Sequence, residues 1–340
     1  MVDRLYGKNS AEVQQPRVNG TVAVSVIIPV HNKAPHIWRS ISSVLNQTFD
    51  DFELIVIDDA STDGSSEEIR KLQDRRIRLF RRDTPGPGGY AARNLGMREA
   101  KGKWIAFLDA DDEWLPEHLQ KMMELAERFP DCEFLSCGWN YAHAGGRTIA
   151  DEFSERNRGG GPREISCKEY LELCIKNMRP VNTDVACLRN NHIARDVFPE
   201  GRAARGGDLH AWLVYLAHAK KLAWSPHIGA VYHLDSVNMV TETAPVTLGF
   251  PRAIVDDLRS LLGKEEMVSL RRYSNRRMCG TWQYCIVSWG PFQLARHVFW
   301  RHDVVFCGVH VALAMIPAFF YRGLRRIYVR TKGIGGRPRS

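Results

Sequence analysis

Short apolar runs alternate along the first third of the chain with segments whose apolar residues recur at helical spacing. The runs VAVSVIIPV (residues 22–30) and FELIVI (residues 52–57) are rich in β-branched residues, which is typical of buried strands. Between them, Ile37, Ile41 and Val44 fall on one face of a helix. This alternation predicts βαβ units, and hence a mostly parallel α/β sheet flanked by helices.

The downstream pattern continues this architecture. A third apolar run, WIAFL (residues 104–108), stops abruptly at acidic residues, and a helix followed by a strand at residues 132–138 is predicted next. Further helices are expected from Lys168 and over residues 208–220, while the stretch ERNRGGGPR (residues 155–163) is interpreted as a mobile loop. In such sheets, functional groups gather at the carboxyl ends of the strands.

The length of 340 residues allows one large α/β core and a smaller appended module. Residues 1–20 mix charged and amide side chains without the apolar run of a secretory signal, so a disordered segment and a cytoplasmic protein are expected. The catalytic domain is assigned to residues 21–244. Residues 245–340, with a helical pattern and many arginines, are assigned to a C-terminal helical extension.

The extension contains an apolar run beside basic residues. Residues 304–321 form a run of 18 residues, interrupted by His310 and Pro317, whose length is marginal for a membrane span. From Phe320 onward, apolar and arginine positions fall on different helical faces, which is typical of an interfacial helix attracted to anionic lipid. The alternative is a buried helix with a solvated basic end. We expect a partly membrane-associated extension, peripheral at the inner face of the cell membrane.

Charge and cysteine content narrow the functional classes. The net charge of +8 is concentrated at the C-terminus, where the last twenty residues hold seven Arg or Lys and no acidic residue. A nucleic-acid reader would interleave aromatic residues with its basic patch, and no such module is visible, so no nucleic acid is expected as a partner. The eight cysteines are scattered without CxxC pairs and are interpreted as buried free thiols.

Four polar clusters stand beside the predicted strands: PVHN at residues 29–32, DDASTDG at 58–64, GPGGYAARN at 86–94 and DADD at 109–112. The first, second and fourth follow a strand, and the third precedes one. The second has a structural alternative as an Asp-Gly turn with a helix cap, and the third as a flexible loop. In the fourth, three carboxylates within four residues repel one another unless a cation compensates. Hard oxygen ligands at a strand end suit Mg²⁺ or Mn²⁺ bridging a diphosphate, which we favour over a capping role before Trp114.

Taken together, the four clusters resemble the inverting glycosyltransferases of sequence family 2, which have the Rossmann-like GT-A fold. The resemblance extends over residues 22–244. The matching features are Pro29-x-His31-Asn32, Asp58-Asp59-x-Ser61-Thr62-Asp63-Gly64, Ala92-Arg93-Asn94-x-Gly96-x-x-x-Ala100-x-Gly102 and Phe107-Leu108-Asp109-Ala110-Asp111-Asp112.

The resemblance implies a binding site for a nucleotide-diphosphate sugar, with a UDP-sugar favoured as the donor. Pro29, His31 and Asn32 would line the base pocket through their main chain, and Asp59 would accept a hydrogen bond from the base. One departure affects this side of the site: the chain has Asp83 in a stretch where family members often carry Asn.

For the rest of the donor, the resemblance implies that Arg93 and Asp109 face the diphosphate and the ribose. Asp111, the second carboxylate of the DxD signature, would coordinate Mn²⁺ or Mg²⁺, which stabilises the departing diphosphate. His233 is a further candidate as a metal ligand or an acceptor contact, although a lone histidine is more often structural.

Asp208 occupies the Asp position of the family's Gly-Glu-Asp pattern, although here the preceding residue is Gly207 rather than an acid. The resemblance implies that Asp208 is the catalytic base, which removes the proton from the attacking hydroxyl. The alternative is an ordinary helix N-cap. Trp212 and Trp224 could stack on sugar rings but are interpreted as core residues.

The chain is therefore expected to be a glycosyltransferase that transfers sugar with inversion to a saccharide or lipid-linked saccharide acceptor, in cell-surface polysaccharide or glycolipid synthesis. Two alternatives stay open. A metal-dependent nucleotidyltransferase would normally carry a Gly-rich signature with a basic residue straight after the first strand, unlike PVHN. A catalytically inactive nucleotide-binding relative would not need the complete set of carboxylates.

Overall fold

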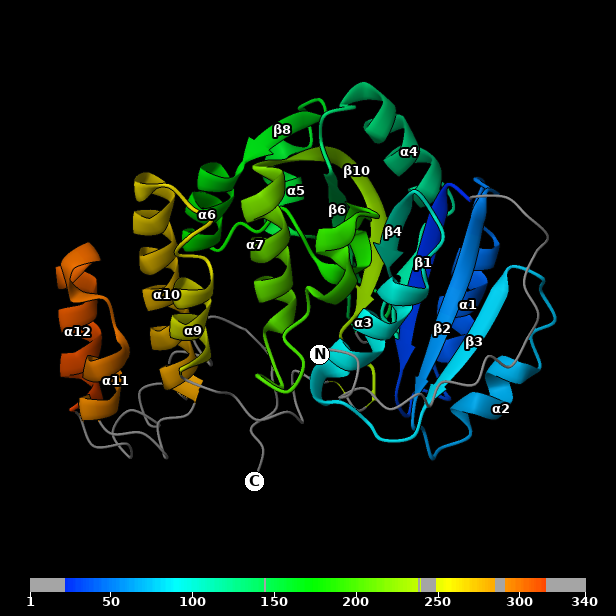
Figure 1. Ribbon diagram of the computed structural model, residues 1–340, viewed down its shortest axis with the longest axis horizontal. Helices are drawn as coiled ribbons and strands as arrows, with labels where there is room; N and C mark the ends of the chain where they lie inside the picture. The colour runs from blue at the N-terminus through cyan, green and yellow to red at the C-terminus, as the bar shows by residue number, and fades with distance from the viewer. Residues whose placement is uncertain (1–21, 144, 238, 240–248, 285–290, 316–340) are drawn as a thin grey trace, which may run out of the picture. The chain divides into compact units, whose positions relative to one another are not determined.

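The computed structural model describes residues 22–143, 145–237, 239, 249–284 and 291–315 (Figure 1). The segment 1–20, for which disorder was predicted, lies outside the described residues. Contacts divide the chain into two compact units, residues 1–245 and 246–340.

The first unit is built on a ten-stranded mixed sheet with the order β3-β2-β1-β4-β9-β6-β10-β5, in which β7 pairs with β6 and β8 with β10 (Figure 1). The longest ladders, β1 with β2 and β6 with β10, are parallel, and the antiparallel pairs are short. This confirms the predicted α/β class. The strands are β1 (Val24–Val30), β2 (Phe52–Asp59), β3 (Ile77–Arg82), β4 (Trp104–Phe107), β5 (Glu113–Trp114), β6 (Phe134–Ala142), β7 (Thr148–Ala150), β8 (Arg163–Ser166), β9 (Cys187–Arg189) and β10 (Lys221–His233).

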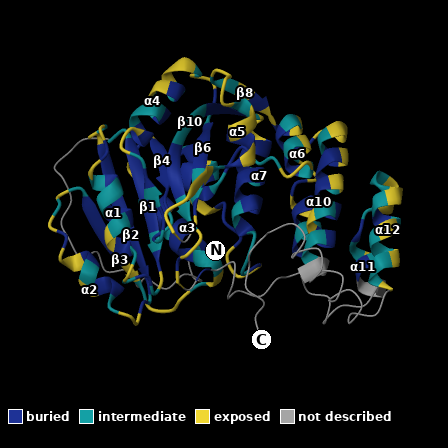
Figure 2. Cartoon of the chain, turned by 180° about the vertical axis from the view of Figure 1, so that it is seen from behind, coloured by how far each residue is buried: buried dark blue, intermediate teal, exposed yellow. Residues whose placement is uncertain are grey.

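Helices cover both faces of this sheet, because its central strands are apolar on both sides; the sheet is accordingly among the most buried parts of the unit (Figure 2). Apolar residues of α1, α2 and α4 pack on one face, while α3 and α7 cover the other. The helices of this unit are α1 (Ile37–Leu45), α2 (Ser65–Arg70), α3 (Tyr90–Glu99), α4 (His118–Arg128), α5 (Glu152–Asn157), α6 (Cys167–Ile175) and α7 (Gly207–Ala219), with 3₁₀ turns η1 (Pro87–Gly89), η2 (Thr183–Val185) and η3 (His192–Asp196).

Two glycines that follow the third cluster, Gly96 and Gly102, allow neighbouring elements to pack closely. A Cβ added at Gly96, in the middle of α3, would lie 2.7 Å from Cγ2 of Ile27. A Cβ at Gly102 would lie 2.4 Å from the backbone nitrogen of Ser25, and the Gly102 N–H donates to the Ser25 hydroxyl at 2.8 Å. These glycines therefore let α3 and the start of β4 approach β1 closely.

The structure corrects the predicted loop at residues 155–163. Its first residues belong to α5, because the Asp151 carboxylate caps this helix by accepting the N–H groups of Phe153 and Ser154 at 2.9 and 3.0 Å. Phe153 is buried against Trp224, with ring centroids 4.7 Å apart. Only residues 158–162 separate α5 from β8.

Other core predictions are confirmed. Trp212 and Trp224 are fully buried and pack among aromatic residues, so they do not present a face to a sugar. The seven cysteines among the described residues are buried free thiols.

The second unit is helical. Its elements are α9 (Phe250–Asp257), α10 (Lys264–Tyr284), α11 (Pro291–His297), η4 (Trp300–His302) and α12 (Val304–Ala314). Buried Cys307 of α12 packs with Met278, Leu294 and Val298, which ties the last three helices together. No helix within the described ranges is long and apolar enough to cross a membrane. The predicted basic helix from Phe320 onward lies outside the described residues.

Replacing Gly102 by alanine should destabilise the first unit, because the added methyl group would overlap the β1 backbone. Overpacking of this kind costs about 1–3 kcal/mol in the free energy of unfolding. Urea denaturation followed by circular dichroism measures the change. Gly161→Ala is the control, since an added Cβ there meets no atom within 4 Å. Equal stability of the Gly102→Ala variant and the wild type would contradict this packing role.

Candidate active site

The site lies where parallel strands end at one edge of the sheet. Val30, at the end of β1, pairs with Asp58 near the end of β2. Phe107, at the end of β4, pairs with Ile27 of β1, so Asp109, two residues further along the chain, lies at the same edge of the sheet. The predicted clusters therefore come together because parallel register places their preceding strands side by side.

The loops after β1 and β2 are cross-linked by hydrogen bonds. The Asn32 N–H donates to the Ser61 hydroxyl at 3.1 Å, and the Asn32 side-chain carbonyl accepts the Thr62 N–H at 2.8 Å. His31 Nδ1 lies 2.7 Å from the carbonyl oxygen of Asp59. Asn32 has a φ of 53°, a left-handed conformation that asparagine tolerates better than most residues.

Part of the second cluster is structural, as its turn alternative proposed. Asp58 accepts the Ser61 N–H at 2.9 Å and bonds the Ser66 hydroxyl, which fixes the turn. The helix-start role is also observed: Asp63 Oδ1 accepts the N–H of Ser65, the first residue of α2, at 3.0 Å, while Gly64 at the N-cap position contributes no side-chain cap. Asp63 accepts the Ala34 N–H at 3.0 Å and so adds another link between the two loops.

Asp59, the predicted base contact, is buried beneath the Gly-rich segment. One of its oxygens pairs with Arg82, and the other accepts the Gly86 N–H at 3.0 Å. Burial raises the pKa of Asp59, while the Gly86 N–H and the Arg82 charge oppose this rise. The carboxylate thereby fixes the start of the third cluster beside the ends of β1 and β2.

Arg93 projects from α3 onto the fourth cluster. Its guanidinium forms an ion pair with Asp109, donates to the Gly88 carbonyl at 2.9 Å and lies over the Phe198 ring, 5.5 Å from the centroid. Burial lowers the pKa of Arg93, but the charge of Asp109 and the hydrogen bond to it outweigh burial, so the guanidinium stays charged. The structure thus brings together the two residues predicted to face the diphosphate and ribose.

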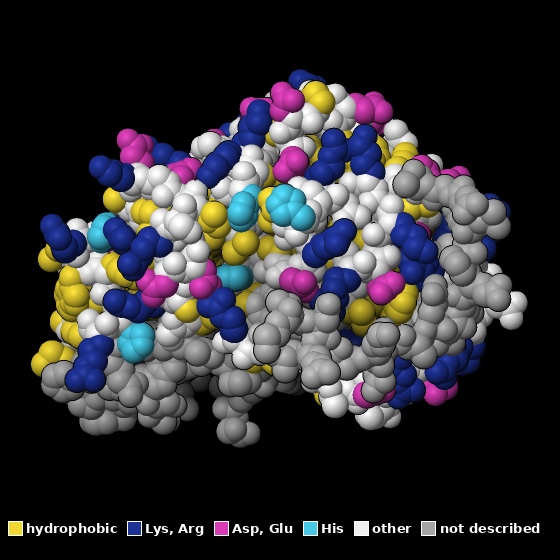
Figure 3. Space-filling view, viewed as in Figure 1, with side chains coloured by type: hydrophobic (Ala, Val, Ile, Leu, Met, Phe, Trp, Pro, Cys, Tyr) yellow, Lys and Arg dark blue, Asp and Glu magenta, His cyan; other side chains and the backbone are white. Residues whose placement is uncertain are grey.

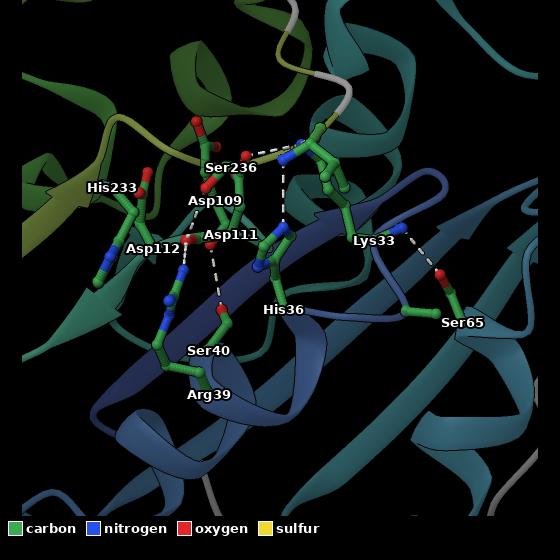
Figure 4. Close-up of polar contacts among 12 residues, drawn as sticks. Lys33, His36, Arg39, Ser40, Ser65, Asp109, Asp111, Asp112, His233 and Ser236 are labelled. Atoms are coloured by element: carbon green, nitrogen blue, oxygen red, sulfur yellow. Dashed lines mark hydrogen bonds and ion pairs between the residues drawn. The ribbon is translucent and has the colours of Figure 1, made fainter. Parts of the chain in front are cut away.

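Asp111, the predicted metal ligand, is held by a lysine. Lys33 Nζ lies 2.6 Å from the Asp111 carboxylate and also donates to the Val237 carbonyl at 2.7 Å. The Asp111 carbonyl accepts from Arg39, and Ser236 Oγ lies 3.5 Å from it (Figure 4). The ammonium group of Lys33, in the loop that follows β1, therefore already compensates the negative charge of Asp111.

Asp112 and Asp184 lie buried beside these residues. Asp112 accepts the His233 backbone N–H at 2.7 Å through Oδ1, but its buried Oδ2 has no hydrogen-bond partner. Asp184, from η2, accepts the Asp109 N–H at 2.9 Å. One oxygen each from Asp109, Asp112 and Asp184 lies within 4.8 Å of the others, close enough to hold one metal ion. Asp184 was not predicted, although an acid directly before the apolar run VACL (residues 185–188) is a signal for it.

The charges at this point do not balance. Asp109 pairs with Arg93 and Asp111 with Lys33, but within the described part of the chain neither Asp112 nor Asp184 has a cationic partner. Burial, followed by the charge of Asp184, raises the pKa of Asp112 well above its ordinary value. Burial and the charge of Asp109 do the same for Asp184. Carboxylate oxygens with an unsatisfied atom among them fit a hard divalent cation.

His233 lies at the edge of this cluster. Its Nε2 lies 3.1 Å from Glu113 Oε1, so its ring is directed to Glu113, while its backbone N–H donates to Asp112. His233 does not belong to the group of three carboxylates that could share a metal ion. The fourth cluster does not cap a helix, because Glu113 and Trp114 form β5.

Asp208 stands at the second position of α7, in the neighbourhood of Arg93 and Tyr90. The Gly207 N–H donates to the Tyr90 hydroxyl at 2.8 Å, which fixes the start of α7 over the start of α3. Burial raises the pKa of Tyr90, and the Asp208 charge adds to this rise. The N-cap of α7 is Gly206, without a side-chain cap, so the capping alternative for Asp208 is wrong. Among the described residues, no hydrogen bond or ion pair engages its carboxylate.

Comparison with known proteins agrees with this geometry. Over 193 residues the chain is 47% identical to an uncharacterized glycosyltransferase of Rickettsia bellii, a match that covers 56% of this chain and 26% of that protein. It is 35% identical over 168 residues to TuaG of Bacillus subtilis, a glycosyltransferase named for teichuronic acid biosynthesis, with coverage of 48% and 60%. The chain thus spans about a quarter and three fifths of these relatives' lengths.

The fold resembles that of Staphylococcus aureus TarS, residues 1–349, solved in complex with UDP-GlcNAc. The TM-score is 0.69 at 17% sequence identity, and the match covers 86% of this chain and 89% of that chain. The likeness confirms the expected GT-A fold. Residues 25–203, more than half of the chain, match the family described as glycosyl transferase family 2. The chain belongs to glycosyl transferase family 2 and has the GT-A fold.

Proposed function

We propose that the protein transfers a sugar from a nucleotide-diphosphate sugar, with a UDP-sugar favoured, to an acceptor hydroxyl with inversion at the anomeric carbon. The observation that carries this proposal is the convergence of Asp109, Asp112 and Asp184 at the carboxyl edge of the sheet, where the charge of Asp111 also acts on Asp112 and Asp184. Asp112 and Asp184 have no cationic partner among the described residues. Such an excess of negative charge would bind a divalent cation and, through it, a diphosphate.

Donor binding would use the loops that the hydrogen bonds already order. Pro29, His31 and Asn32 would line the base pocket through their main chain, with Asp59 beneath it as the acceptor for the base. Support for UDP comes from the TarS structure, which was solved in complex with UDP-GlcNAc. Arg93, held over Phe198 and paired with Asp109, would contribute a fixed positive charge toward the diphosphate.

Mn²⁺ or Mg²⁺ at this cluster would neutralise the negative charge that develops on the departing diphosphate. Asp111 and Asp109 are the members that keep some exposure, with 15% and 28% of their side chains accessible, whereas Asp112 and Asp184 are buried. Asp111 would coordinate the metal by exchanging Lys33 for it. His233 stays a candidate ligand in this proposal. To reach the metal, its ring would have to change rotamer and leave Glu113.

Asp208 would act as the base. An inverting transfer is an in-line displacement, so a group opposite the leaving diphosphate must take the proton of the attacking hydroxyl. The Asp208 carboxylate is only partly buried, and no hydrogen bond or ion pair within the described residues competes for it. The charge of Asp208 acts on Arg93, and with Arg93 on the donor side Asp208 would stand close to the reacting centre.

For the acceptor, we propose a saccharide or lipid-linked saccharide in cell-surface polysaccharide or glycolipid synthesis. The support is the relative named for teichuronic acid biosynthesis. Synthesis on a lipid carrier would place the protein at the inner face of the cell membrane, and we propose that the second unit supplies this peripheral contact. The exposed valines of α12 support the contact.

Asp111→Asn should weaken the binding of Mn²⁺ measured by calorimetry in the presence of UDP. The substitution removes a ligand charge with little change in volume. The affinity should fall by more than the roughly tenfold to hundredfold that loss of an outer-shell partner costs. A chelator should abolish transfer, and added Mn²⁺ should restore it.

Asp196→Asn is the matched control for this measurement, because Asp196 is exposed and pairs with Arg98 on the surface. If Asp111→Asn binds Mn²⁺ as tightly as this control, Asp111 is not a ligand. Full transfer activity after chelation would refute metal dependence altogether.

Asp208→Asn should reduce turnover by about a hundredfold or more, since a general base contributes at least that much. Release of UDP from the sugar donor gives the rate. UDP affinity and the melting temperature should stay near wild type, because Asp208 neither caps α7 nor forms an ion pair. Near-normal turnover would mean that another group removes the proton.

A further inference from the structure

An arginine-lined pocket lies in the second unit, outside the residues of the candidate active site. Its volume is about 570 Å³. It is lined by Val268, Arg271 and Arg272 of α10 and by Arg301, His302 and Asp303 at the entry to α12. Four of these six side chains are cationic or can become so, which indicates an anionic ligand.

The charge of the pocket comes from its three arginines. Asp303, the one acid in the lining, forms an ion pair with Arg276 at 3.0 Å. Burial, and then the charges of Arg271 and Arg301, lower the pKa of His302, so this imidazole is neutral near pH 7. Arg271 Nη1 lies 3.1 Å from His302 Nε2 and can donate to it.

No acidic side chain of the described ranges forms an ion pair with Arg271, Arg272 or Arg301. Three guanidinium groups around one pocket match a phosphate, whose oxygens accept several N–H groups in fork geometry. The helix α12 begins at the same place without a side-chain cap, so the N–H groups of its first turn add partial positive charge.

The pocket has an apolar flank. Val304, Val305 and Val309 of α12 are 61%, 79% and 51% exposed, although Cys307 on the same helix is buried. Hydrophobic side chains accordingly gather over α12 (Figure 3). Val268, in the pocket wall, is also exposed, and so is Trp300 just before the pocket. A soluble phosphate would make no use of this flank, whereas a phospholipid has both an anionic headgroup and apolar chains.

We propose that this pocket binds the phosphate headgroup of an anionic phospholipid, while Val304, Val305 and Val309 enter the boundary of the acyl chains. The inference rests on the membrane contact in the proposed function and names the residues that make it. It assigns the headgroup to α10 and η4, and the apolar contact to α12.

The test is sedimentation of the full chain with vesicles of 30% phosphatidylglycerol in phosphatidylcholine, compared with pure phosphatidylcholine. The variant is Arg272→Gln with Arg301→Gln, since both side chains are exposed and outside the hydrogen bonds that hold the helices together. Each arginine near an anionic surface contributes about fivefold in affinity, so the pair should lose about twentyfold or more. Val305→Asp should weaken the same binding independently.

The matched control is Arg259→Gln with Arg277→Gln, which removes the same charge at exposed positions outside the pocket. Arg277 lies on the opposite side of α10 from Arg271 and Arg272, given 3.6 residues per turn. This control should retain most of its binding. Unchanged melting temperatures show that both variants fold.

Three results would overturn the proposal. If the control variant loses as much vesicle affinity as the pocket variant, the binding depends on the net charge of the protein and not on the pocket. Vesicle binding that survives in the pocket variant would leave the membrane contact intact and place it elsewhere. Binding of inorganic phosphate without vesicle binding, in the wild type, would make the pocket a site for soluble anions and would also refute the membrane contact.

Discussion

Four carboxylates repel one another at the end of β4, and the surrounding residues compensate part of this repulsion. Arg93 faces Asp109, and Lys33 faces Asp111, while backbone N–H groups reach Asp112 and Asp184. Burial makes each remaining negative charge more costly, because little water can screen it. The site thus lacks positive charge, and a divalent cation bound to a diphosphate donor would supply it.

The scaffold that brings these groups together depends on close backbone packing. Gly96 and Gly102 let α3 and β4 press against β1, and this approach places Arg93 over Asp109. On the other side, the hydrogen bond from Gly207 to the Tyr90 hydroxyl fixes α7, which carries Asp208. Donor-side charge and the proposed base are therefore positioned by the same helix, α3.

The sequence predicted the parts of the fold that depend on local pattern. The apolar runs before the first, second and fourth clusters became β1, β2 and β4, and parallel register then required these three clusters to meet at one edge. The loop prediction at residues 155–163 was wrong in its first part, because Asp151 caps α5 eight residues before the first glycine of the stretch, Gly159.

The site was predictable only where its residues stand in recognisable motifs. Asp184 was missed because it comes from a short 3₁₀ turn, and its proximity to Asp109 depends on the antiparallel addition of β9 beside β4. The ion pair of Lys33 with Asp111 was missed for a similar reason, since a lysine in a loop has no periodicity to mark it. Long-range pairing, rather than local composition, decides both contacts.

The most direct test of this account is anomalous diffraction at the manganese edge from crystals containing MnCl₂ and UDP. The account predicts one strong peak in contact with the Asp111 carboxylate and with the diphosphate, and Lys33 withdrawn from Asp111. UDP bound in the site with no peak at these carboxylates, and with the Lys33 ion pair intact, would contradict it.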